Sequence, residues 1–585
     1  MKKFFYSFMG SLAAIWLSVL LGGLLIVLTI LALAKQFADP EIEVSDHSVL
    51  RIDLTGEIVD RATEVSFMDL INEEYVGTLS LSDIVNSIRA AKTDSRIDGI
   101  LIDCGGLSAG LAQCEEIIDA IKDFKKSGKW VVAYGDNYSQ ADYFIATSAG
   151  EIYANPVGMV DIHGLSATTF YFKSLLEKVG VECQVVKVGT YKSAVEPFLL
   201  DGMSEPNREQ IDHFLGRIWD DMADSIAVAR HTHVDSINAW ANSFSFAQTP
   251  ESYMQRKIID HTAYRRQIDS LVMARTKTEE PQYVDFQDYC TTIADDETKE
   301  PQKTIPVLYA VGDITEDADD GIASDRLVPQ ILDLAKDDDI DGLVLRVNSG
   351  GGSAFASEQI WEALQQFKTS GKPFYVSMGD YAASGGYYIS CGADKIYASP
   401  LTLTGSIGIF GIIPNVEPLM KDKLGVNAVT VETNTGNFPG LLHQMTPEQR
   451  DAMQSYVDRG YDLFVSRCAQ SRGMTVEQIG AIAQGRVWDG LSALENGLVD
   501  DLGGLRRTLE DMAAKLGVTY ADVRIVEYPE VNQNWWAQIA GMQSQQIYSA
   551  LAGAIDPQSA LFARIAARVR SMYPLQCRMN YLQIK

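Results

Sequence analysis

Basic residues and paired cysteines are scarce in this chain. Its 585 residues include 49 Lys and Arg against 78 Asp and Glu, which leaves a formal net charge of −29 at pH 7. A nucleic-acid-binding protein needs a basic surface to neutralise phosphates, so this balance argues against that class. The seven cysteines are scattered, odd in number and include no Cys-x-x-Cys pair. We therefore predict free or buried thiols, and neither a disulfide framework nor a zinc site.

Charged side chains are also absent from a long N-terminal stretch, Phe4 to Ala34. About 20 apolar residues span a bilayer, so the stretch predicts a membrane anchor over residues 1–38. A cleaved signal peptide is the alternative, because Ala32-Leu33-Ala34 resembles a cleavage site, but signal-peptide apolar cores run to only about 7–15 residues. Lys2 and Lys3 precede the stretch, so the positive-inside rule leaves the short N-terminus in the cytoplasm and the large body outside.

Beyond this stretch the chain contains a degraded internal repeat, with corresponding residues about 244 positions apart. The register is fixed by Gly135-Asp136 with Gly379-Asp380, Tyr143 with Tyr387, Ser127-Gly128-Lys129 with Ser370-Gly371-Lys372, and Ile152–Pro156 with Ile396–Pro400. A chain of this length should hold more than one domain, because single cores stop growing at roughly 250–300 residues. We predict two tandem domains, over residues 39–300 and 301–527.

Strands alternate with helices in each repeat. An apolar strand, Gly99–Ile102 or Gly342–Leu345, leads into a glycine-rich turn, an amphipathic helix and a second strand. This order predicts parallel βαβ units and an α/β fold class, with the reactive turns at the carboxyl ends of strands. Mixed acidic and basic residues around 270–302 predict a linker between the repeats, and residues 528–585, which include Trp535-Trp536, predict a helical C-terminal tail.

One turn differs between the repeats in a way that indicates chemistry. The second repeat reads Asp380-Tyr-Ala-Ala-Ser384-Gly-Gly-Tyr387, whereas the first has Gln140 in place of Ser384 and Ala141-Asp142 in place of the two glycines. Small neighbours let a substrate backbone approach the Ser384 hydroxyl, which makes this residue a candidate nucleophile. A serine between a strand and a helix is also typical of an N-cap, and the local sequence leaves both interpretations open.

Two more turns of the second repeat accompany Ser384. Arg346-Val-Asn-Ser-Gly350-Gly351-Gly352-Ser353 follows a strand and opens a helix, where backbone N–H groups can bind an anion as an oxyanion hole requires. A phosphate-binding loop is the rival, although the Walker lysine and the G-x-G-x-x-G spacing are missing, and a flexible helix-entry turn stays open. Thr404-Gly405-Ser406 comes 22 residues after Ser384, and its serine has no counterpart in the first repeat.

A serine nucleophile needs a proton acceptor, and none of the seven histidines lies in these turns. Neutral lysine serves in Ser/Lys enzymes. The candidate is Lys192, because the aligned segment Glu432–Pro439 of the second repeat has no lysine. A lone lysine is most often a solvated surface charge, but here one repeat lacks the serine and the other lacks the lysine. His231 and His233 form a possible metal pair without a nearby third ligand, so we predict no metal and no other cofactor.

These segments resemble the signal peptide peptidase A family in its long, duplicated, membrane-anchored form, from the anchor to about residue 520. The resemblance is carried by Ala-Ala-Ser384-Gly-Gly-Tyr, Leu-Thr-Gly-Ser406-Ile-Gly, Val-Asn-Ser-Gly-Gly-Gly-Ser353 and Tyr-Lys192-Ser-Ala-Val-Glu. It implies ClpP/crotonase-like repeats with Ser384 as nucleophile and Lys192 as general base. It also implies that Ser406 orients the lysine amine and that the N–H groups of Gly351 and Gly385 line the oxyanion hole. The family usually has proline where Gly350 stands, which leaves the rigidity of that loop open.

The resemblance further implies a serine endopeptidase of the bacterial inner membrane, with its body on the periplasmic side and its active sites inside a homotetramer. Its substrates would be apolar peptides such as signal-peptide remnants. An ordinary lysine, with a pKa of about 10.4, is protonated at neutral pH, but burial can lower that value by several units. Activity should therefore rise with pH.

Two other classes of function remain as alternatives. A crotonase-like acyl-CoA enzyme shares the fold and the glycine-rich turn but needs no anchor. A non-catalytic, peptide-binding membrane scaffold would not be labelled by a serine-directed probe.

Overall fold

The computed structural model describes residue 10 and residues 42–61, 78–293, 301–317, 321–434, 436–529, 576–579 and 583–584. Two units are distinguished, Met1–Asp46 and His47–Lys585, and the description below concerns the second. Apart from Gly10, the predicted anchor lies outside the described residues. No helix among the residues that are described is long and apolar enough to cross a membrane.

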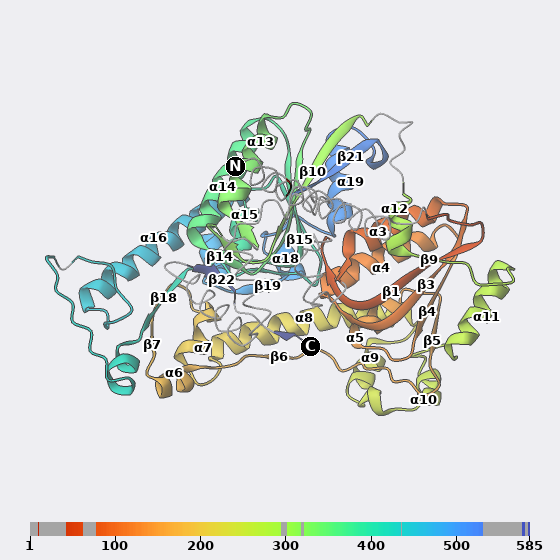
Figure 1. Cartoon of the computed structure of the whole chain (residues 1–585), viewed down its shortest axis with the longest axis horizontal. Helices are drawn as coiled ribbons and strands as arrows, with labels where there is room; N and C mark the ends of the chain where they lie inside the picture. Colours follow the sequence, from red (N-terminus) through yellow and green to blue (C-terminus); the bar gives the residue numbers. More distant parts are fainter. Residues whose placement is uncertain are drawn as a thin grey trace. The chain divides into compact units, whose positions relative to one another are not determined.

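The first repeat is built on a parallel sheet with the strand order β2-β1-β3-β4-β5-β8, and β9 pairs with β1 (Figure 1). Its strands are β1 (Ser48–Val59), β2 (Thr78–Ser80), β3 (Ile97–Ser108), β4 (Trp130–Gly135), β5 (Glu151–Ala154), β8 (His261–Thr262) and β9 (Tyr283–Asp285). The helices that alternate with them are α3 (Leu81–Thr93), α4 (Leu111–Lys125) and α5 (Gln140–Ala146). The βαβ prediction is thus confirmed for this half.

The rest of the first half is mainly helical. Its elements are β6 (Ala167–Thr168), α6 (Lys173–Val179), β7 (Glu182–Lys187), α7 (Glu196–Leu199), α8 (Glu205–Ala229), α9 (Val234–Ala241), α10 (Pro250–Gln255), α11 (Arg265–Thr276) and α12 (Phe286–Thr291). The predicted linker around 270–302 is wrong over much of its length. Strand β9 pairs with β1, with Asp285 opposite Arg51, and Arg51 Nε lies 2.5 Å from Asp285 Oδ1. Helix α12 packs on α3.

The second repeat has a sheet with the order β19-β17-β15-β13-β10-β21, parallel except where β19 joins β17. Its strands are β10 (Lys303–Val311), β13 (Leu343–Ser349), β15 (Phe374–Ala383), β16 (Lys395–Ala398), β17 (Leu403–Gly405), β19 (Val487–Asp489), β20 (Asp501–Leu502) and β21 (Val523–Tyr528). Its helices are α13 (Ser324–Lys336), α14 (Ala354–Thr369), α15 (Gly385–Ser390), α16 (Pro447–Arg472), α17 (Val476–Ile482), α18 (Gly490–Glu495) and α19 (Leu505–Lys515).

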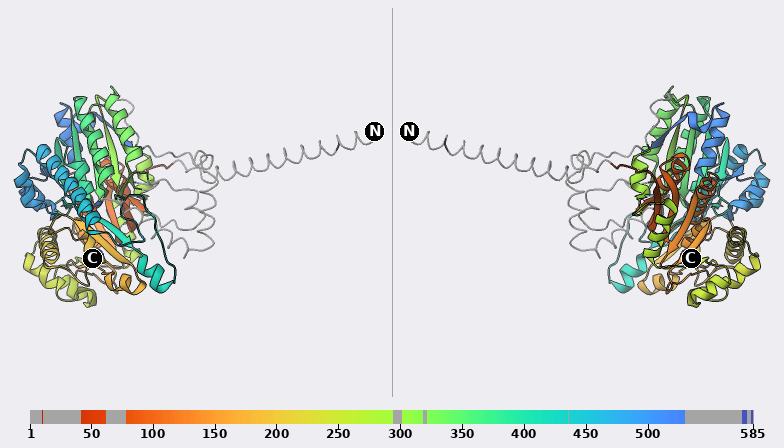
Figure 2. Two further views of the ribbon diagram at one scale, coloured as in Figure 1. Left: turned by 90° about the vertical axis from the view of Figure 1, so that its left-hand side faces the viewer. Right: turned by 90° about the vertical axis from the view of Figure 1, so that its right-hand side faces the viewer.

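Helices cover both faces of this second sheet, which explains why its strands read as continuous apolar runs. Leu345 belongs to the larger core, with α13 and α14, whereas its neighbour Val344 packs with Met512 of α19 on the opposite face. Successive residues of a strand point to opposite faces. Figure 1 labels these helices on the ribbon, and Figure 2 gives side views of the same strands.

A third sheet joins segments from distant parts of the chain, in the order β12-β11-β14-β22-β18-β7. Its strands besides β7 are β11 (Ile314–Thr315), β12 (Ile322–Ala323), β14 (Gly351–Ser353), β18 (Phe410–Asn415) and β22 (Gln576–Arg578). A short strand β23 (Gln583–Ile584) pairs with β6. The predicted helical tail is therefore wrong at residues 576–578 and 583–584, while residues 530–575 lie outside the described part of the chain.

Candidate active site

Strand pairing between the repeats carries Lys192 to the second half of the chain. Strand β7 runs antiparallel to β18, with Lys187 opposite Phe410 and Glu182 opposite Asn415. The chain continues from β7 into the loop that holds Lys192, whose neighbour Tyr191 donates its N–H to the Gln484 carbonyl at 3.0 Å. A residue of the first repeat is thereby held among loops of the second.

Lys192 and Ser384 are in direct contact in the interior of the protein. Lys192 Nζ donates to Ser384 Oγ at 2.7 Å, and Lys192 and Ser384 are 1% and 0% exposed. The same amine lies 3.0 Å from the carbonyl oxygen and 3.1 Å from Oγ of Ser406. The three residues that the sequence singled out from separate turns therefore meet at one nitrogen atom.

Ser384 stands at the N-cap position of α15, but its hydroxyl does not cap the helix. The backbone has φ 57° and ψ −112°, and Ser406 also has a positive φ of 51°. Residues other than glycine rarely adopt such angles, which cost of order 1–3 kcal/mol each and cluster at functional sites. The backbone is thus held in an unfavourable conformation at both serines, and the Ser384 hydroxyl is turned to the lysine.

Two glycines make room for the lysine side chain. A Cβ atom on Gly408 would lie 3.1 Å from Lys192 Cδ, and one on Gly485 would lie 2.7 Å from Lys192 Cα. Gly485 also has a φ of +79°, a conformation that L side chains rarely adopt. Gly408 belongs to the Ser406 turn that the sequence singled out, whereas no sequence pattern predicted a role for Gly485. The Ala-Gln-Gly-Arg486 turn gives no local signal that a lysine from the other repeat passes there.

The glycine-rich turn lies next to the strand that leads to Ser384. Gly351 donates its N–H to Ser349 Oγ at 3.1 Å, so this group has a partner within its own turn. Gly385 is the first residue of α15, and the first N–H groups of a helix have no partner inside it. The structure therefore puts both predicted donors beside the serine turn.

Strand β15 carries a bulge just before Ser384. Its pairing with β13 runs from Leu343 opposite Phe374 to Val347 opposite Met378, and then shifts so that Ser349 lies opposite Ala382. Asn348 fills the irregularity, because its Oδ1 accepts the N–H of Tyr381 at 3.1 Å. Bulges near active sites redirect side chains. The corresponding pairing of β3 with β4 in the first repeat has no such shift.

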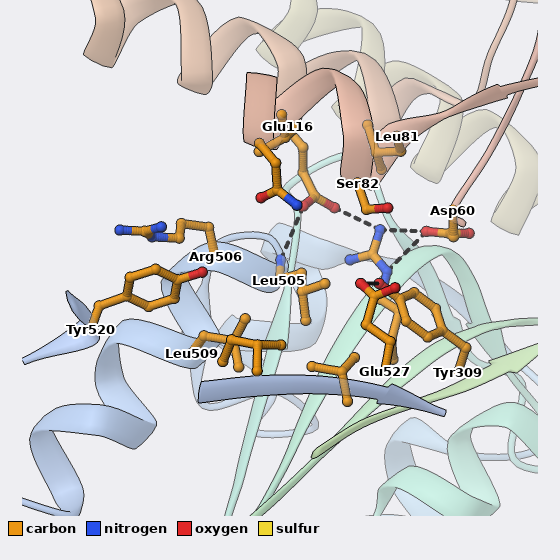
Figure 3. Close-up of a pocket in the computed structure, with 15 residues that line it drawn as sticks. Asp60, Leu81, Ser82, Glu116, Tyr309, Leu505, Arg506, Leu509, Tyr520 and Glu527 are labelled. Atoms are coloured by element: carbon orange, nitrogen blue, oxygen red, sulfur yellow. Dashed lines mark hydrogen bonds and ion pairs between the residues drawn. The ribbon is translucent and has the colours of Figure 1, made fainter. Parts of the chain in front are cut away.

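Carboxylates of the first repeat hold this part of the second one. Asp60, next to the end of β1, accepts from Arg346 Nη2 at 2.7 Å and from Asn348 Nδ2 at 2.6 Å. Glu116 of α4 contacts the same guanidinium at 2.6 Å. Both carboxylates line a cavity of about 90 Å³ between the repeats (Figure 3). Burial would lower the pKa of Arg346, but the carboxylates of Glu116 and Asp60 outweigh it and raise the pKa.

A second link runs through the bulge itself. Asp380, which lies inside it, accepts the N–H of Ala112 at the start of α4 at 2.9 Å. Burial raises the pKa of the Asp380 carboxyl to about 6, and the charge of Asp60 adds to the shift. The first repeat thus contacts β13 through its own buried Asp60 and β15 through Asp380, which β15 itself supplies.

The two tyrosines after Ser384 have different surroundings. Tyr387 is fully buried and donates to the Leu498 carbonyl at 3.0 Å, which is a core contact. Tyr388 donates to Glu358 at 2.7 Å. It also lines a cavity of about 250 Å³, together with Phe355, Ile409, Tyr456 and Leu463. A partly apolar recess therefore opens beside the helix that follows Ser384.

Within the described part of the chain, metal ligands and disulfides do not contribute to this arrangement. Among the residues that the structure describes, no group of three or more His, Cys, Asp or Glu side chains is placed to hold a metal ion. Six of the seven cysteines have described side chains, and all six are free: Cys104, Cys114, Cys183, Cys290, Cys391 and Cys468.

Comparisons with known proteins agree with a peptidase. The family model described as "Peptidase family S49" matches residues 123–277 and 366–519, and the one described as "Clp protease" matches residues 310–403. Protease 4 of Salmonella typhi is 36% identical over 79% of this chain and 77% of its own length. Protease 4 of Haemophilus influenzae is 35% identical over 84% and 82%. The chloroplastic serine protease SPPA of Arabidopsis thaliana is 29% identical over 81% and 70%.

The family matches fall once in each repeat and together cover more than half of the chain, and the two bacterial relatives align over most of both lengths. The chain therefore belongs to peptidase family S49, as a serine peptidase of the SppA type.

Proposed function

We propose that this chain cleaves peptides with a Ser/Lys dyad, in which Ser384 is the nucleophile and Lys192 the general base. The observation that carries the proposal is the 2.7 Å contact between Lys192 Nζ and Ser384 Oγ in the protein interior. The oxygens of Ser384 and Ser406 that the amine contacts are neutral. Burial disfavours the charged ammonium form of lysine, so a neutral amine can accept a proton at this position.

Each step of the proposed reaction has a group to perform it. Lys192 takes the proton from Ser384 as Oγ attacks the scissile carbonyl, and the N–H groups of Gly351 and Gly385 stabilise the oxyanion. For this the Gly351 N–H exchanges Ser349 Oγ for the substrate oxygen. Lys192 then protonates the leaving amine, and water hydrolyses the acyl-enzyme. Ser406 holds the amine through its hydroxyl and carbonyl oxygens.

Apolar peptides are the proposed substrates. The cavity beside α15 offers Phe355, Ile409 and Leu463 to one substrate side chain, and ligand sites are typically apolar with a few placed polar groups. Signal-peptide remnants are apolar peptides of this kind, and they are also the substrates that the family resemblance implies.

We also propose that residues 1–38 anchor the chain in the bacterial inner membrane, with the body on the periplasmic side as a homotetramer. The charge-free stretch from Phe4 to Ala34 supports the anchor. Membrane fractionation of the full chain and of residues 40–585 tests it, because only the former should sediment with inner membranes. Recovery of both in the soluble fraction would contradict the anchor.

The direct test of the peptidase is cleavage of a fluorogenic apolar peptide by the full chain in detergent. We expect Ser384→Ala to lower kcat by at least about 10³-fold, the order found when a triad member is removed. Gln140→Ala, at the matching position of the first repeat, should keep kcat within about twofold. A serine-directed probe should label the wild type and the Gln140 variant but not Ser384→Ala. Equal labelling of all three would contradict the assignment.

A further inference from the structure

The turn of residues 483–486, which leads into β19, contacts both parts of the candidate site. Tyr191, the residue just before the proposed base, donates its N–H to the Gln484 carbonyl at 3.0 Å. On the other side of the turn, Ser406 donates its N–H to the Arg486 carbonyl at 2.7 Å. The turn therefore joins the backbone beside the lysine to the backbone of the serine that contacts the lysine amine.

Gln210 of helix α8 connects the same two parts of the site from the protein interior, where it is 1% exposed. Its Nε2 donates to the Tyr191 carbonyl at 3.1 Å and to Ser193 Oγ at 3.3 Å. The side chain thus reaches the residues on both sides of Lys192. Its Oε1 accepts the N–H of Val487, the first residue of β19, at 3.1 Å. Figure 1 labels α8 next to β19, and the two elements are in contact.

The hydrogen-bond partners fix the orientation of the Gln210 amide. A backbone N–H can only donate and a carbonyl oxygen can only accept, so the amide oxygen faces Val487 and the amide nitrogen faces Tyr191. A third acceptor, Asn207 Oδ1 of the same helix, lies 3.0 Å from Nε2. The amide is therefore bonded at both ends in one orientation, and it links two segments of the protein that are far apart in the sequence.

A second set of contacts holds the turn from its more exposed side. The guanidinium carbon of Arg486 lies 4.8 Å from the centre of the Tyr191 ring and 4.5 Å from that of the Trp488 ring. Such cation–π contacts are attractive. Arg486 Nη1 also lies 3.2 Å from Oε1 of Glu209, the residue that precedes Gln210 on α8. Successive residues of one helix therefore hold the same turn from two sides.

The position of the lysine backbone decides where the lysine amine can lie. A lysine side chain is a flexible four-carbon stem, so the place of its amine depends on the anchoring of its Cα atom and on the walls around the stem. Lys192 Nζ lies 2.7 Å from Ser384 Oγ and 3.1 Å from Ser406 Oγ. A misplacement of about 1 Å at a reacting group can lower a rate by about 10²-fold. The backbone anchors on both sides of Lys192 therefore bear on catalysis.

We propose that Gln210 is a positioning residue of the dyad, whose amide holds the backbone on both sides of Lys192 against the strand beside the Ser406 turn. That strand is β19, in which Val487 lies opposite Gly405 of β17. The inference rests on the proposed Ser/Lys function and adds a residue that acts through the base. Gln210 does not line the cavity beside α15. Its loss should therefore lower kcat and leave KM nearly unchanged.

The first experiment compares Gln210→Leu with Gln184→Leu in the full chain, on a fluorogenic apolar peptide. Gln184 is also buried and also accepts a backbone N–H of the second repeat, that of Met445 at 2.6 Å. Its Nε2, however, has no hydrogen-bond partner in the described part of the chain. Gln210→Leu should lower kcat by about 10²-fold with KM within about twofold, whereas Gln184→Leu should keep both within about twofold. A wild-type kcat in Gln210→Leu would overturn the inference.

The second experiment shows whether Gln210 acts through Lys192. The rate at which a serine-directed probe labels Ser384 is measured for Gln210→Leu in the wild-type chain and in Lys192→Met. The substitution should slow labelling by about 10²-fold in the wild type and by less than about twofold in Lys192→Met, because residues that act as a unit give non-additive effects. Equal slowing in both chains would show that Gln210 belongs to the general framework, and would overturn the positioning role.

Two further variants provide the same test if Gln210→Leu does not fold. Gln210→Glu has nearly the same shape and keeps an acceptor for the Val487 N–H, but an ionised carboxylate cannot donate to the Tyr191 carbonyl. Its kcat at neutral pH should therefore fall as well. Arg486→Met removes the contacts on the more exposed side and should lower kcat by about fivefold at an unchanged KM. Folded variants that both keep the wild-type kcat would contradict the proposal.

Melting temperatures separate a loss of folded protein from a loss of catalysis in these variants. A lowered kcat in a chain that stays folded at the assay temperature supports the positioning role. If Lys192→Met and Ser384→Ala keep wild-type activity, the proposed dyad fails and this inference fails with it. If those two variants lose activity while the Gln210 and Arg486 variants fold and keep kcat, only the positioning role fails.

Discussion

In the first repeat Tyr143 donates to the Ile258 carbonyl at 2.9 Å, and in the second Tyr387 donates to the Leu498 carbonyl at 3.0 Å. The ion pairs agree as well, since Arg230 contacts Asp260 at 2.8 Å and Arg472 contacts Asp500 at 2.5 Å. These framework contacts place Gln140 and Ser384 at equivalent positions. The scaffold has therefore been kept in both halves, and the differences at the turn between strand and helix can be compared residue by residue.

At that turn the Gln140 side chain of the first repeat is hydrogen-bonded to the backbone of the neighbouring turn. Gln140 Oε1 accepts the N–H groups of His163 and Gly164, and its Nε2 donates to the Gly164 carbonyl at 2.9 Å. A cavity of about 700 Å³ still opens beside it, lined in part by Leu107 and Leu165. The first repeat thus retains space but has no hydroxyl at the position of Ser384. What it contributes is Lys192, together with the carboxylates that hold the second repeat.

Removal of the Asp60 carboxylate should give the largest loss in the free energy of unfolding. The loss should exceed that from removing Asp103, which pairs with Arg265 in the first repeat. Asp60 and Arg346 are 2% and 1% exposed, and removal of one partner of a buried ion pair costs about 3–5 kcal/mol. Asp103 and Arg265 form a partly exposed pair, of a kind that contributes about 1 kcal/mol or less. Chemical denaturation of Asp60→Ala and Asp103→Ala should show this order. Equal losses of stability would contradict the conclusion that Asp60 holds the two repeats together through Arg346.

The equivalent aspartates of the two turns should respond to pH in opposite directions. Burial raises the pKa of Asp380 to about 6, so in the folded state this carboxyl keeps a proton that the unfolded chain has already lost. Its contribution to the free energy of unfolding therefore falls as pH rises from about 4 to 6, by at most about 3 kcal/mol. Asp136 accepts from Tyr134 and Asn155, which lower its pKa. Its contribution is present above the unfolded pKa and is lost as pH falls through the folded pKa.

Stability curves between pH 3 and 7 for the wild type, Asp380→Asn and Asp136→Asn separate these contributions. The wild type minus Asp380→Asn should give a curve that falls with pH, and the wild type minus Asp136→Asn one that rises. Two difference curves of the same sign would show that the turns do not differ in this way.

Proline substitutions at Gly350 and Gly106 should give the smallest changes in stability, and the two changes should have opposite signs. A Cβ on either glycine would meet no atom within 4 Å, but Gly106 has a φ of +100° and Gly350 lies outside that left-handed region. Proline requires a φ near −65°. Gly350→Pro should therefore stabilise the chain by about 0.4–1 kcal/mol and keep kcat within about threefold, whereas Gly106→Pro should destabilise it. Thermal unfolding and one activity assay check both, and a loss of stability in Gly350→Pro would contradict this account of the loop.

The features that sequence patterns predicted well are local ones. The apolar runs around Leu101 and Leu345 predicted the parallel strands, and the mismatch between Gln140 and Ser384 led to the two residues of the proposed dyad, which lie in contact in the structure. Patterns along the chain carry no information on which distant strands pair. The β7–β18 pairing, the close approach at Gly485 and the bulge at Asp380 were therefore missed. The C-terminal strand was missed for the same reason, because residues 576–578 gain their order from β14 and β18.

The most direct test of the split dyad is the pH dependence of labelling of Ser384 by a serine-directed probe, for the wild type, Lys192→Met and the partly exposed control Lys173→Met. The wild-type rate should rise between pH 6 and 10 as Lys192 loses its proton. Lys192→Met should react at least about 10³-fold more slowly with no such rise, and Lys173→Met should match the wild type. A flat wild-type profile, or labelling of Lys192→Met at the wild-type rate, would show that the base lies elsewhere.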